Sequence, residues 1–336
     1  MIVSYTAVVG AGALAVLCCA WRTAWRGDAA AGSVPGEAGD AATPGARQRR
    51  QEQLQGDLAA VLGGQAAALP VDFARALLRE DGGGSPPPLA GQPLQTVALQ
   101  RPFVAVLASQ LCRLLQDGAW PAYPAVSNAE LLKLELDASE AHTRWAALVL
   151  EQLRPQADAD EPRRLPGVAR VLSGLGTRGV STLLGQRHTA GSVATALPPS
   201  REELQDAADA LHRPDVRGSK LTVGGRALAK HIHRGSDSHW ARAGAAAVSS
   251  GQPQPSGTLR GGDGVKSEMA SGALRQLLDD ACWANTHKLP GELRVHEVRN
   301  EAGYGARWAI DQSGSVAFRG FLEPQSKDGH ENKWRH

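Results

Sequence analysis

The sequence is poor in aromatic residues, cysteine and net charge, and each shortage excludes a class of protein. Phenylalanine, tryptophan and tyrosine make up 4% of the 336 residues, whereas glycine and proline number 38 and 20. This composition indicates short globular parts between Ala/Gly/Pro-rich spacers rather than one continuous core. Four cysteines exclude a disulfide-stabilised scaffold. A formal net charge of +2 argues against a protein that coats nucleic acid, so no nucleic-acid partner is expected.

Several short motifs of metal, nucleotide and hydrolase sites are also missing. The sequence contains no HExxH, no CxxC pair, no GxxxxGK[ST] loop and no GxSxG turn. Zinc-protease, zinc-finger, P-loop and α/β-hydrolase sites therefore lack support. We predict no metal site and no cofactor.

Residues 2–21 form a long uncharged run. Twenty residues at a rise of 1.5 Å span about 30 Å, the thickness of a bilayer's hydrocarbon core, which predicts a transmembrane helix. Trp21 and Arg22 favour the cytosolic interface, so we expect a single-pass membrane protein with its C-terminal region in the cytosol. A cleaved targeting sequence is the alternative, although no basic residue precedes the run. Gly10 and Gly12 also fit a dinucleotide fingerprint, but no second strand follows.

The four cysteines agree with a reducing compartment. Cys18 and Cys19 lie at the cytosolic end of the apolar run, where reversible palmitoylation is possible in principle. Two small apolar residues inside a helix are the simpler interpretation of this pair. Cys112 and Cys282 fall within apolar helical patterns, which are typical of buried, unreactive thiols.

The rest of the chain alternates between spacers and periodic segments. We expect an anchor over 1–26, a disordered tether with short helices over 27–93, a helical region over 94–240, a disordered linker over 241–265, and a helix with a β-meander over 266–336. Ser200 and Glu203 have the spacing of a capping box at a helix start. The predicted fold class is α+β: an N-terminal transmembrane helix, a helical middle region, and a C-terminal helix plus a three-stranded antiparallel β-meander, joined by long disordered linkers.

After Pro290 the hydrophobic pattern changes from helical to alternating. The segments ELRVHEVR, GYGARWAID and SVAFRGFLE predict three antiparallel strands. If the loop DQSGS joins the last two strands, Trp308 pairs with Phe318 and Ile310 pairs with Val316. These pairs would form an apolar face for the preceding helix, which we expect over roughly 266–287.

On the other face, the predicted register places Arg307 directly opposite Arg319. Like charges opposite each other are destabilising, so Glu323 or Glu297, solvent screening or a bound anion must offset them. Two solvated arginines are the simpler interpretation, but guanidinium groups also bind phosphate and carboxylate through two hydrogen bonds. The tail adds a tryptophan and an arginine that fold back onto the sheet or contact a partner. The candidate binding residues are Arg307, Arg319, Glu323, Trp334 and Arg335.

The histidines allow a second interpretation, as an enzyme. Three of them lie near carboxylates of the C-terminal segment, where convergence would give an acid–base or metal cluster. Histidines near a chain end are more often exposed, which makes this the alternative. The residues concerned are His296, His330 and His336, with Glu297, Glu323 and Asp328.

The C-terminal segment contains a Cys-Trp pair, GYGARW, F-x-GFLEP, Gly-His and a final W-x-H. This pattern resembles the C-terminus of a family of uncharacterised proteins from plants and other eukaryotes. LTVGGRALAKHIHR at 221–234, followed by Trp240, resembles the same family's middle block. The resemblance covers about a third of the chain and implies no particular activity.

These features together predict a membrane-tethered cytosolic binding or scaffold protein rather than an enzyme. Its expected partners are a membrane, through residues 2–21, and a protein or small anionic ligand on the Arg/Trp face. The alternative is a hydrolase or transferase that acts on an anionic substrate through the C-terminal histidines. RNA binding by Arg307, Arg319 and Phe321 is disfavoured, because a stacking platform usually shows two or three aromatic residues on its open face.

Overall fold

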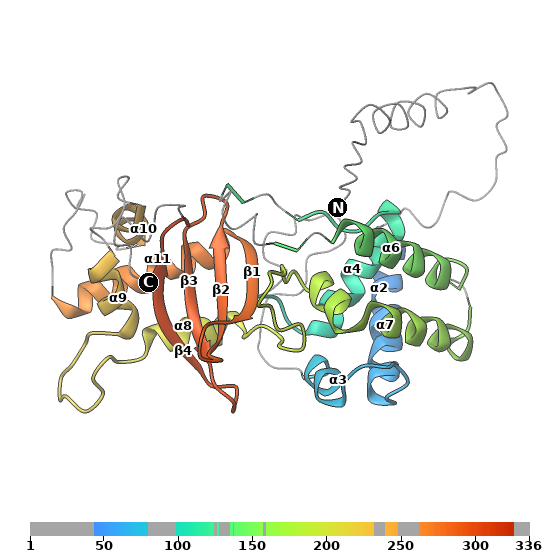
Figure 1. The fold of residues 1–336 in the computed structure, drawn as a ribbon, viewed down its shortest axis with the longest axis horizontal. Coiled ribbons are helices and arrows are strands. Elements are labelled where there is room, and N and C mark those ends of the chain that lie inside the picture. The colour runs from blue at the N-terminus through green and yellow to red at the C-terminus, as the bar shows by residue number, and fades with distance from the viewer. Residues whose placement is uncertain are drawn as a thin grey trace, which may run out of the picture. The chain divides into compact units, whose positions relative to one another are not determined.

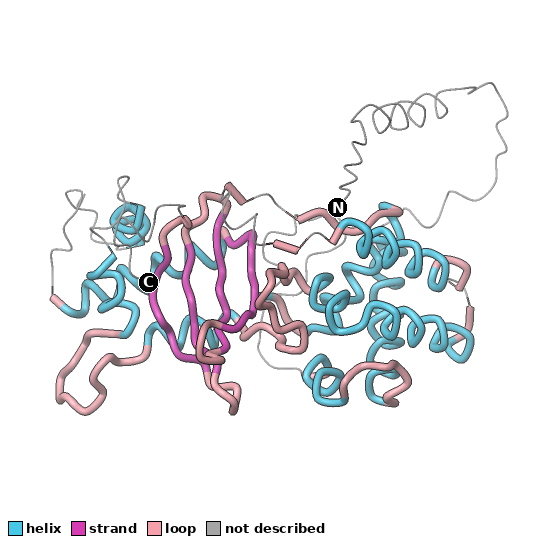
Figure 2. Tube along the Cα trace, viewed as in Figure 1, coloured by secondary structure: helices cyan, strands magenta, loops and turns pink. Residues whose placement is uncertain are grey.

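The computed structural model describes residues 44–79, 99–123, 126–127, 135–136, 138–156, 159–231, 239–247 and 262–325. Within these ranges the chain forms nine α-helices and one four-stranded antiparallel sheet (Figures 1 and 2). The predicted α+β class is confirmed. The predicted anchor at 2–21 lies outside the described residues, and no helix within them is long and apolar enough to cross a bilayer.

The elements follow one another from an all-helical part to a part built around the sheet. The helices are α2 (Pro44–Gly63), α3 (Val71–Leu77), α4 (Phe103–Asp117), α6 (Ser139–Leu153), α7 (Glu161–Leu183), α8 (Arg201–Asp209), α9 (Val223–His231), α10 (His239–Ala247) and α11 (Asp263–Asp279). The strands are β1 (Ala281–Lys288), β2 (Arg294–Asn300), β3 (Gly305–Ile310) and β4 (Val316–Leu322), which lie in this order in the sheet.

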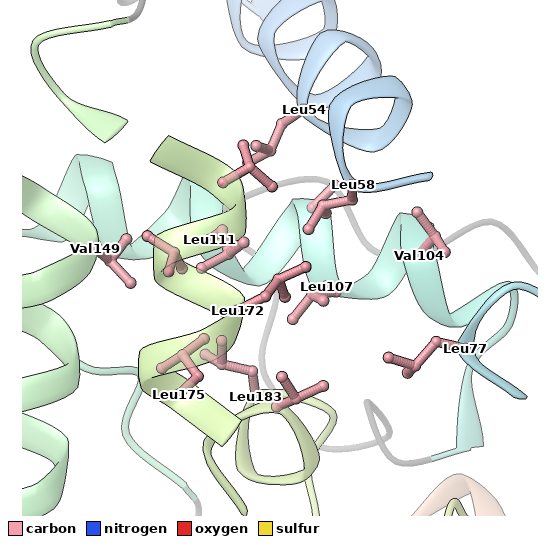
Figure 3. Close-up of a cluster of buried hydrophobic side chains, with 14 of the residues drawn as sticks. Leu54, Leu58, Leu77, Val104, Leu107, Leu111, Val149, Leu172, Leu175 and Leu183 are labelled. Atoms are coloured by element: carbon pink, nitrogen blue, oxygen red, sulfur yellow. The ribbon is translucent and has the colours of Figure 1, made fainter. Parts of the chain in front are cut away.

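Helices α2, α3, α4, α6 and α7 share a leucine-rich core (Figure 3). Leu58 of α2, Leu107 and Leu111 of α4, and Leu172 of α7 are fully buried in it. Each such leucine stabilises the fold by about 1.5–3 kcal/mol relative to an exposed one. The core therefore unites segments that are more than 100 residues apart in the sequence.

Helices α2 and α3 lie within the tether predicted over 27–93, where short helices are expected. Leu54, Leu58, Val61 and Leu62 are all buried, and their i, i+4, i+7, i+8 spacing makes a continuous apolar stripe on α2. Packing against α4 and α7 then stabilises a helix that composition alone disfavours.

One face of the sheet packs against helices α8, α9 and α11. Trp308, Phe318 and Val298 lie on this face, in a core shared with Leu274 of α11. The indole Nε1 of Trp308 donates a hydrogen bond to the carbonyl oxygen of Leu204 in α8 at 2.9 Å. The indole ring is therefore packed in the apolar core, and its N–H group has a hydrogen-bond acceptor.

Strand β1 corrects the prediction of a helix over 266–287 and of a three-stranded meander. Helix α11 ends at Asp279, and residues 281–288 pair with β2, for example Asn285 with Glu297. Residues 281–286 are buried on both faces of the strand, so their sequence shows no apolar–polar alternation. Backbone pairing with β2 decides the conformation, which local pattern cannot reveal.

Helix α10 corrects the prediction of a disordered linker that begins at residue 241. Trp240 in this helix is 1% exposed, and its ring centroid lies 4.6 Å from that of Phe321. One aromatic side chain anchors a helix whose other residues are mostly alanine and glycine.

The register of β3 and β4 confirms part of the prediction. Trp308 pairs with Phe318, and Ile310 pairs with Val316, as expected. A bulge then shifts the register between Trp308 and Arg307, so that Arg307 lies opposite Gly320 and not Arg319. The predicted opposition of two arginines is therefore wrong.

The Ser200–Glu203 capping box at the start of α8 is confirmed. The backbone N–H of Glu203 donates to Oγ of Ser200 at 3.1 Å, and the backbone N–H of Ser200 donates to Oε2 of Glu203 at 2.7 Å. This cap fixes the position of α8, which carries the acceptor of the Trp308 hydrogen bond.

We predict that Trp308→Ala lowers the free energy of unfolding by about 3–5 kcal/mol, because it leaves a large cavity and removes the hydrogen bond to Leu204. Trp308→Phe keeps most of the apolar volume and should cost clearly less. Urea denaturation followed by circular dichroism measures both. A loss below about 1 kcal/mol for Trp308→Ala would show that the ring does not hold this core together.

Candidate functional site

The face of the sheet opposite to the helices carries a buried charged cluster at its centre. Glu297 on β2 is 1% exposed. Its Oε1 accepts a hydrogen bond from Nε of Arg299 at 2.6 Å, and its Oε2 accepts two from Nε and Nη2 of Arg307 at 2.9 and 2.7 Å. A carboxylate without such partners would be very costly to bury.

The protonation of Glu297 follows from these contacts. Burial raises the pKa of its carboxyl group, but the positive charges of Arg299 and Arg307 outweigh burial and bring the pKa down to about 2. Glu297 is therefore ionised at neutral pH and holds both guanidinium groups in fixed positions.

Arg299 is fully buried and reaches from Glu297 toward the end of β4. Its Nη1 donates to the carbonyl oxygens of Gly303 at 2.5 Å and Glu323 at 3.0 Å. Its Nη2 is buried and has no hydrogen-bond partner among the residues that the structure describes. An unpaired buried donor of this kind costs free energy, so it marks an unsatisfied point of the cluster.

The path of Arg299 requires a glycine on the neighbouring strand. Gly305 is its register partner on β3. A Cβ at this position would lie 2.8 Å from Cγ of Arg299 and 2.4 Å from the carbonyl oxygen of Val298. The first glycine of GARW therefore makes room for the arginine stem across β3.

A histidine–glutamate pair lies beside this cluster. His231, the last residue of α9, has its Nδ1 2.7 Å from Oε1 of Glu323, which follows β4. The two side chains are 12% and 10% exposed. Glu323 thus links the pair to the cluster, because its backbone oxygen accepts the hydrogen bond from Arg299.

Gly320 brings the histidine ring close to Arg307. A Cβ on Gly320 would lie 3.8 Å from Nε2 of His231, so the ring sits over this glycine. Gly320 is the register partner of Arg307, next to the bulge. His231 therefore contacts β4 at the level of Arg307.

Close packing of α9 positions His231. A Cβ on Gly225 would lie 2.9 Å from Oγ of Ser267 in α11, and one on Gly224 would lie 3.0 Å from the carbonyl oxygen of Ala208. The two glycines of LTVGGRALAKH let α9 approach its neighbours, and α9 also contacts β4 (Figure 1).

The arrangement brings a histidine, a carboxylate and two guanidinium groups into one part of the fold. If the hydrogen bond to Glu323 uses the proton on Nδ1 of His231, Nε2 is the nitrogen left to exchange a proton with a bound molecule. Arg299 and Arg307 add positive charge, and the side chain of Arg307 is partly exposed. Within the described ranges, no group of three or more His, Cys, Asp or Glu side chains is placed to hold a metal ion.

The predicted site residues are placed as follows. Arg307 and Glu323 belong to the cluster and the histidine pair, and Arg319 is the exposed extra residue of the bulge. Glu297, predicted as one possible counter-charge, is the partner of Arg307. The remaining tail candidates and the two cysteines lie outside the described residues: Asp328, His330, Trp334, Arg335, His336, Cys18 and Cys19.

His296 lies on the helix-covered face rather than at this site. It is fully buried beside Trp308, and its Nδ1 is 2.9 Å from Oγ1 of Thr286. Burial, more than the nearby charges, lowers its pKa to about 3, so its ring is neutral. His231, rather than the C-terminal histidines named in the sequence analysis, is the histidine that the structure places beside a carboxylate of this face. Its signal was the quoted ALAKH segment, but sequence spacing does not show that a helix end reaches β4.

A family model described as the CdiA C-terminal tRNase toxin domain matches residues 212–323, one third of the 336 residues. The matched stretch contains α9, α10, α11 and the whole sheet, and hence every residue of the cluster and the pair. Comparisons with curated proteins and with solved structures found no match.

This match corrects three predictions. The resemblance to an uncharacterised eukaryotic family is wrong, because the motifs that carried it lie largely within the stretch similar to a tRNase toxin domain. The interpretation as a membrane-tethered binding or scaffold protein without a nucleic-acid partner is wrong for the same reason. A net charge of +2 for the whole chain conceals a local cluster of arginines. The alternative, a hydrolase or transferase for an anionic substrate, is the one that the similarity favours.

Proposed function

We propose that residues 212–323 form a ribonuclease that cleaves tRNA on the polar face of the sheet. The similarity to a tRNase toxin domain supports the substrate. The observation that carries the proposal is the contact between His231 and Glu323 beside the buried cluster of Glu297, Arg299 and Arg307.

The chemistry of RNA defines what such a site must do. In the simplest reaction the ribose 2′-oxygen attacks the adjacent phosphorus and loses its proton, while the bond from phosphorus to the 5′-oxygen breaks and that oxygen gains a proton. The products are a 2′,3′-cyclic phosphate and a 5′-hydroxyl. The protein must exchange a proton and stabilise negative charge on the phosphoryl oxygens.

His231 is the residue suited to the proton exchange. Its Nδ1 is held by Glu323, which fixes the ring and leaves Nε2 directed toward the region above Gly320. This arrangement supports His231 as a general acid or base.

The arginines are suited to hold the phosphate. Arg307 is 15% exposed at its side chain and reaches the surface, whereas Arg299 is fully buried and contributes its positive charge from below. Glu297 is a positioning residue. Its low pKa and burial make it a poor proton acceptor, and it fixes both guanidinium groups before the substrate arrives.

His287 is the other histidine on this face, but it lies on β1. Strands β1 and β4 are separated by three strand spacings, about 14 Å. A single phosphorus atom cannot lie next to both His287 and His231 at that separation. His231, which has Glu323 as its hydrogen-bond partner, is the candidate that we propose.

We predict that His231→Gln lowers the rate of tRNA cleavage by about 10²–10⁴-fold, because glutamine keeps a polar side chain but cannot exchange the proton. The binding affinity for tRNA should change little, since the arginines remain. Cleavage is followed by gel electrophoresis of tRNA, and the cyclic phosphate product is identified at the newly formed 3′ ends.

His212→Gln is the matched control for this experiment. His212 lies in the loop before α9, 3.5 Å from Nη1 of Arg226, and takes no part in the pair with Glu323. The His212→Gln variant should cleave tRNA at the rate of the unmodified protein. Full activity of His231→Gln would exclude His231 as the proton carrier, and a chain that cleaves no tRNA would refute the function.

We predict that Glu297→Gln lowers the free energy of unfolding by about 3–5 kcal/mol at pH 7, because it leaves two arginines without their carboxylate. The folded-state pKa of Glu297 lies below its unfolded value. Its stabilising contribution is therefore fully present above about pH 4.5 and is lost as the pH falls toward about 2.

The stability difference between Glu297→Gln and the unmodified chain should therefore shrink below pH 4.5. Denaturant titrations at several pH values measure it. Glu268→Gln, at an exposed position on α11, is the control and should change stability by less than about 0.5 kcal/mol. A difference that stays constant down to pH 2.5 would show that the two arginines do not depress the pKa of Glu297.

A further inference from the structure

We infer that a cavity at the end of the sheet binds a second phosphate group of the tRNA. This inference rests on the proposed function and extends it to a separate surface. The cavity has a volume of about 240 Å³ and is bordered by the end of α3, the residue before α4, the loop 195–200, the start of β2 and the β3–β4 turn.

Three arginines from three different segments line this cavity. Arg79 follows α3, Arg101 precedes α4, and Arg294 opens β2. Among the lining residues that the structure describes, Glu203 is the single acid. Its carboxylate is engaged in the capping box with the backbone N–H of Ser200. The lining therefore carries three positive charges against one negative charge.

A second nearby carboxylate is also engaged elsewhere. Asp311, in the β3–β4 turn, accepts hydrogen bonds from the backbone N–H groups of Ser313 at 2.8 Å and Ser315 at 2.9 Å. The hydroxyl of Ser313 donates a further hydrogen bond to the same carboxylate. That bond, followed by the backbone bonds, lowers the pKa of the Asp311 carboxyl group. Arg294 contacts only the backbone of this residue, since its Nη2 donates to the Asp311 carbonyl at 2.6 Å.

Two of the arginines are held in place before any ligand binds. Arg101 is 4% exposed, donates to the carbonyl oxygen of Pro198 at 2.5 Å and lies 3.8 Å from the ring centroid of Phe103. Nε of Arg294 is buried and has no partner within the described ranges. A fixed guanidinium group with a spare donor suits a phosphate, which accepts several hydrogen bonds at once.

The position of the cavity favours a phosphate of RNA over a small free anion. Arg294 precedes Glu297 by three residues on β2, about 10 Å along the strand. The place over Gly320 lies two strand spacings further across the sheet, about 10 Å. One RNA strand of several nucleotides that passes around the end of the sheet reaches both places. A phosphate contact away from the reacting bond adds affinity and fixes the register of the substrate.

The test uses the full chain with His231→Gln, so that tRNA is bound but not cleaved. Arg79→Gln and Arg294→Gln are each added to it. Arg79 is exposed, so its replacement should leave folding intact. Arg275→Gln, at an exposed position on α11, is the charge-matched control. We measure the dissociation constant for tRNA between 50 and 300 mM salt, and the melting temperature with inorganic pyrophosphate.

We expect each cavity variant to weaken tRNA binding several-fold and to reduce the slope of log K against log salt by about one, while Arg275→Gln changes neither. Pyrophosphate should raise the melting temperature of the parent more than that of Arg294→Gln. Unchanged tRNA affinity in both cavity variants would overturn the inference. If those variants bind tRNA normally and lose only the stabilisation by pyrophosphate, the cavity is a site for a small anion and not for tRNA.

Failure of the proposed function is distinguishable from failure of this inference. If the unmodified chain cleaves no tRNA but the cavity variants still lose tRNA affinity, the second phosphate site stands without the nuclease. If cleavage occurs and the cavity variants bind tRNA normally, the nuclease stands and the polar face alone holds its substrate.

Discussion

The face of the sheet opposite to the helices depends on one buried carboxylate. Glu297 lies at the centre of the sheet and binds two arginines. Burying either the carboxylate or the guanidinium groups without the opposite charge would be strongly destabilising. From Glu297 the hydrogen bonds continue through Arg299 to the backbone of Glu323. The side chain of Glu323 in turn contacts His231. A strand, a helix end and the residue after β4 are thus joined into one surface with fixed charges.

Two glycines and a bulge give this surface its shape. Gly305 allows the Arg299 stem to cross β3, and Gly320, next to His231, has a φ of 143°, which favours glycine. The bulge in β4 puts Gly320, rather than Arg319, opposite Arg307. In a regular register a long charged side chain would occupy the position over which the histidine lies. The irregular point of the sheet is therefore where its chemical groups meet.

The matched stretch does not stand alone in this chain. Residues 187–193, which precede it, run along the outer edge of β1, with hydrogen bonds from Arg187 N–H to the Ala284 carbonyl and from Val193 N–H to the Thr286 carbonyl. Asn285 on the polar face is held by Ser192 at 2.7 Å. The edge strand, which would otherwise present unpaired backbone groups, is covered by an upstream segment.

The sequence by itself determined the α+β class, the burial of Trp308, its pairing with Phe318 and the cap of α8, because these features arise from local periodicity and spacing. Only the tertiary structure decided that 281–288 is a strand, that Arg307 lies opposite Gly320, and that His231 reaches Glu323. Strand pairing, bulges and contacts across 92 residues depend on distant backbone and on packed volume. No window of neighbouring residues contains that information.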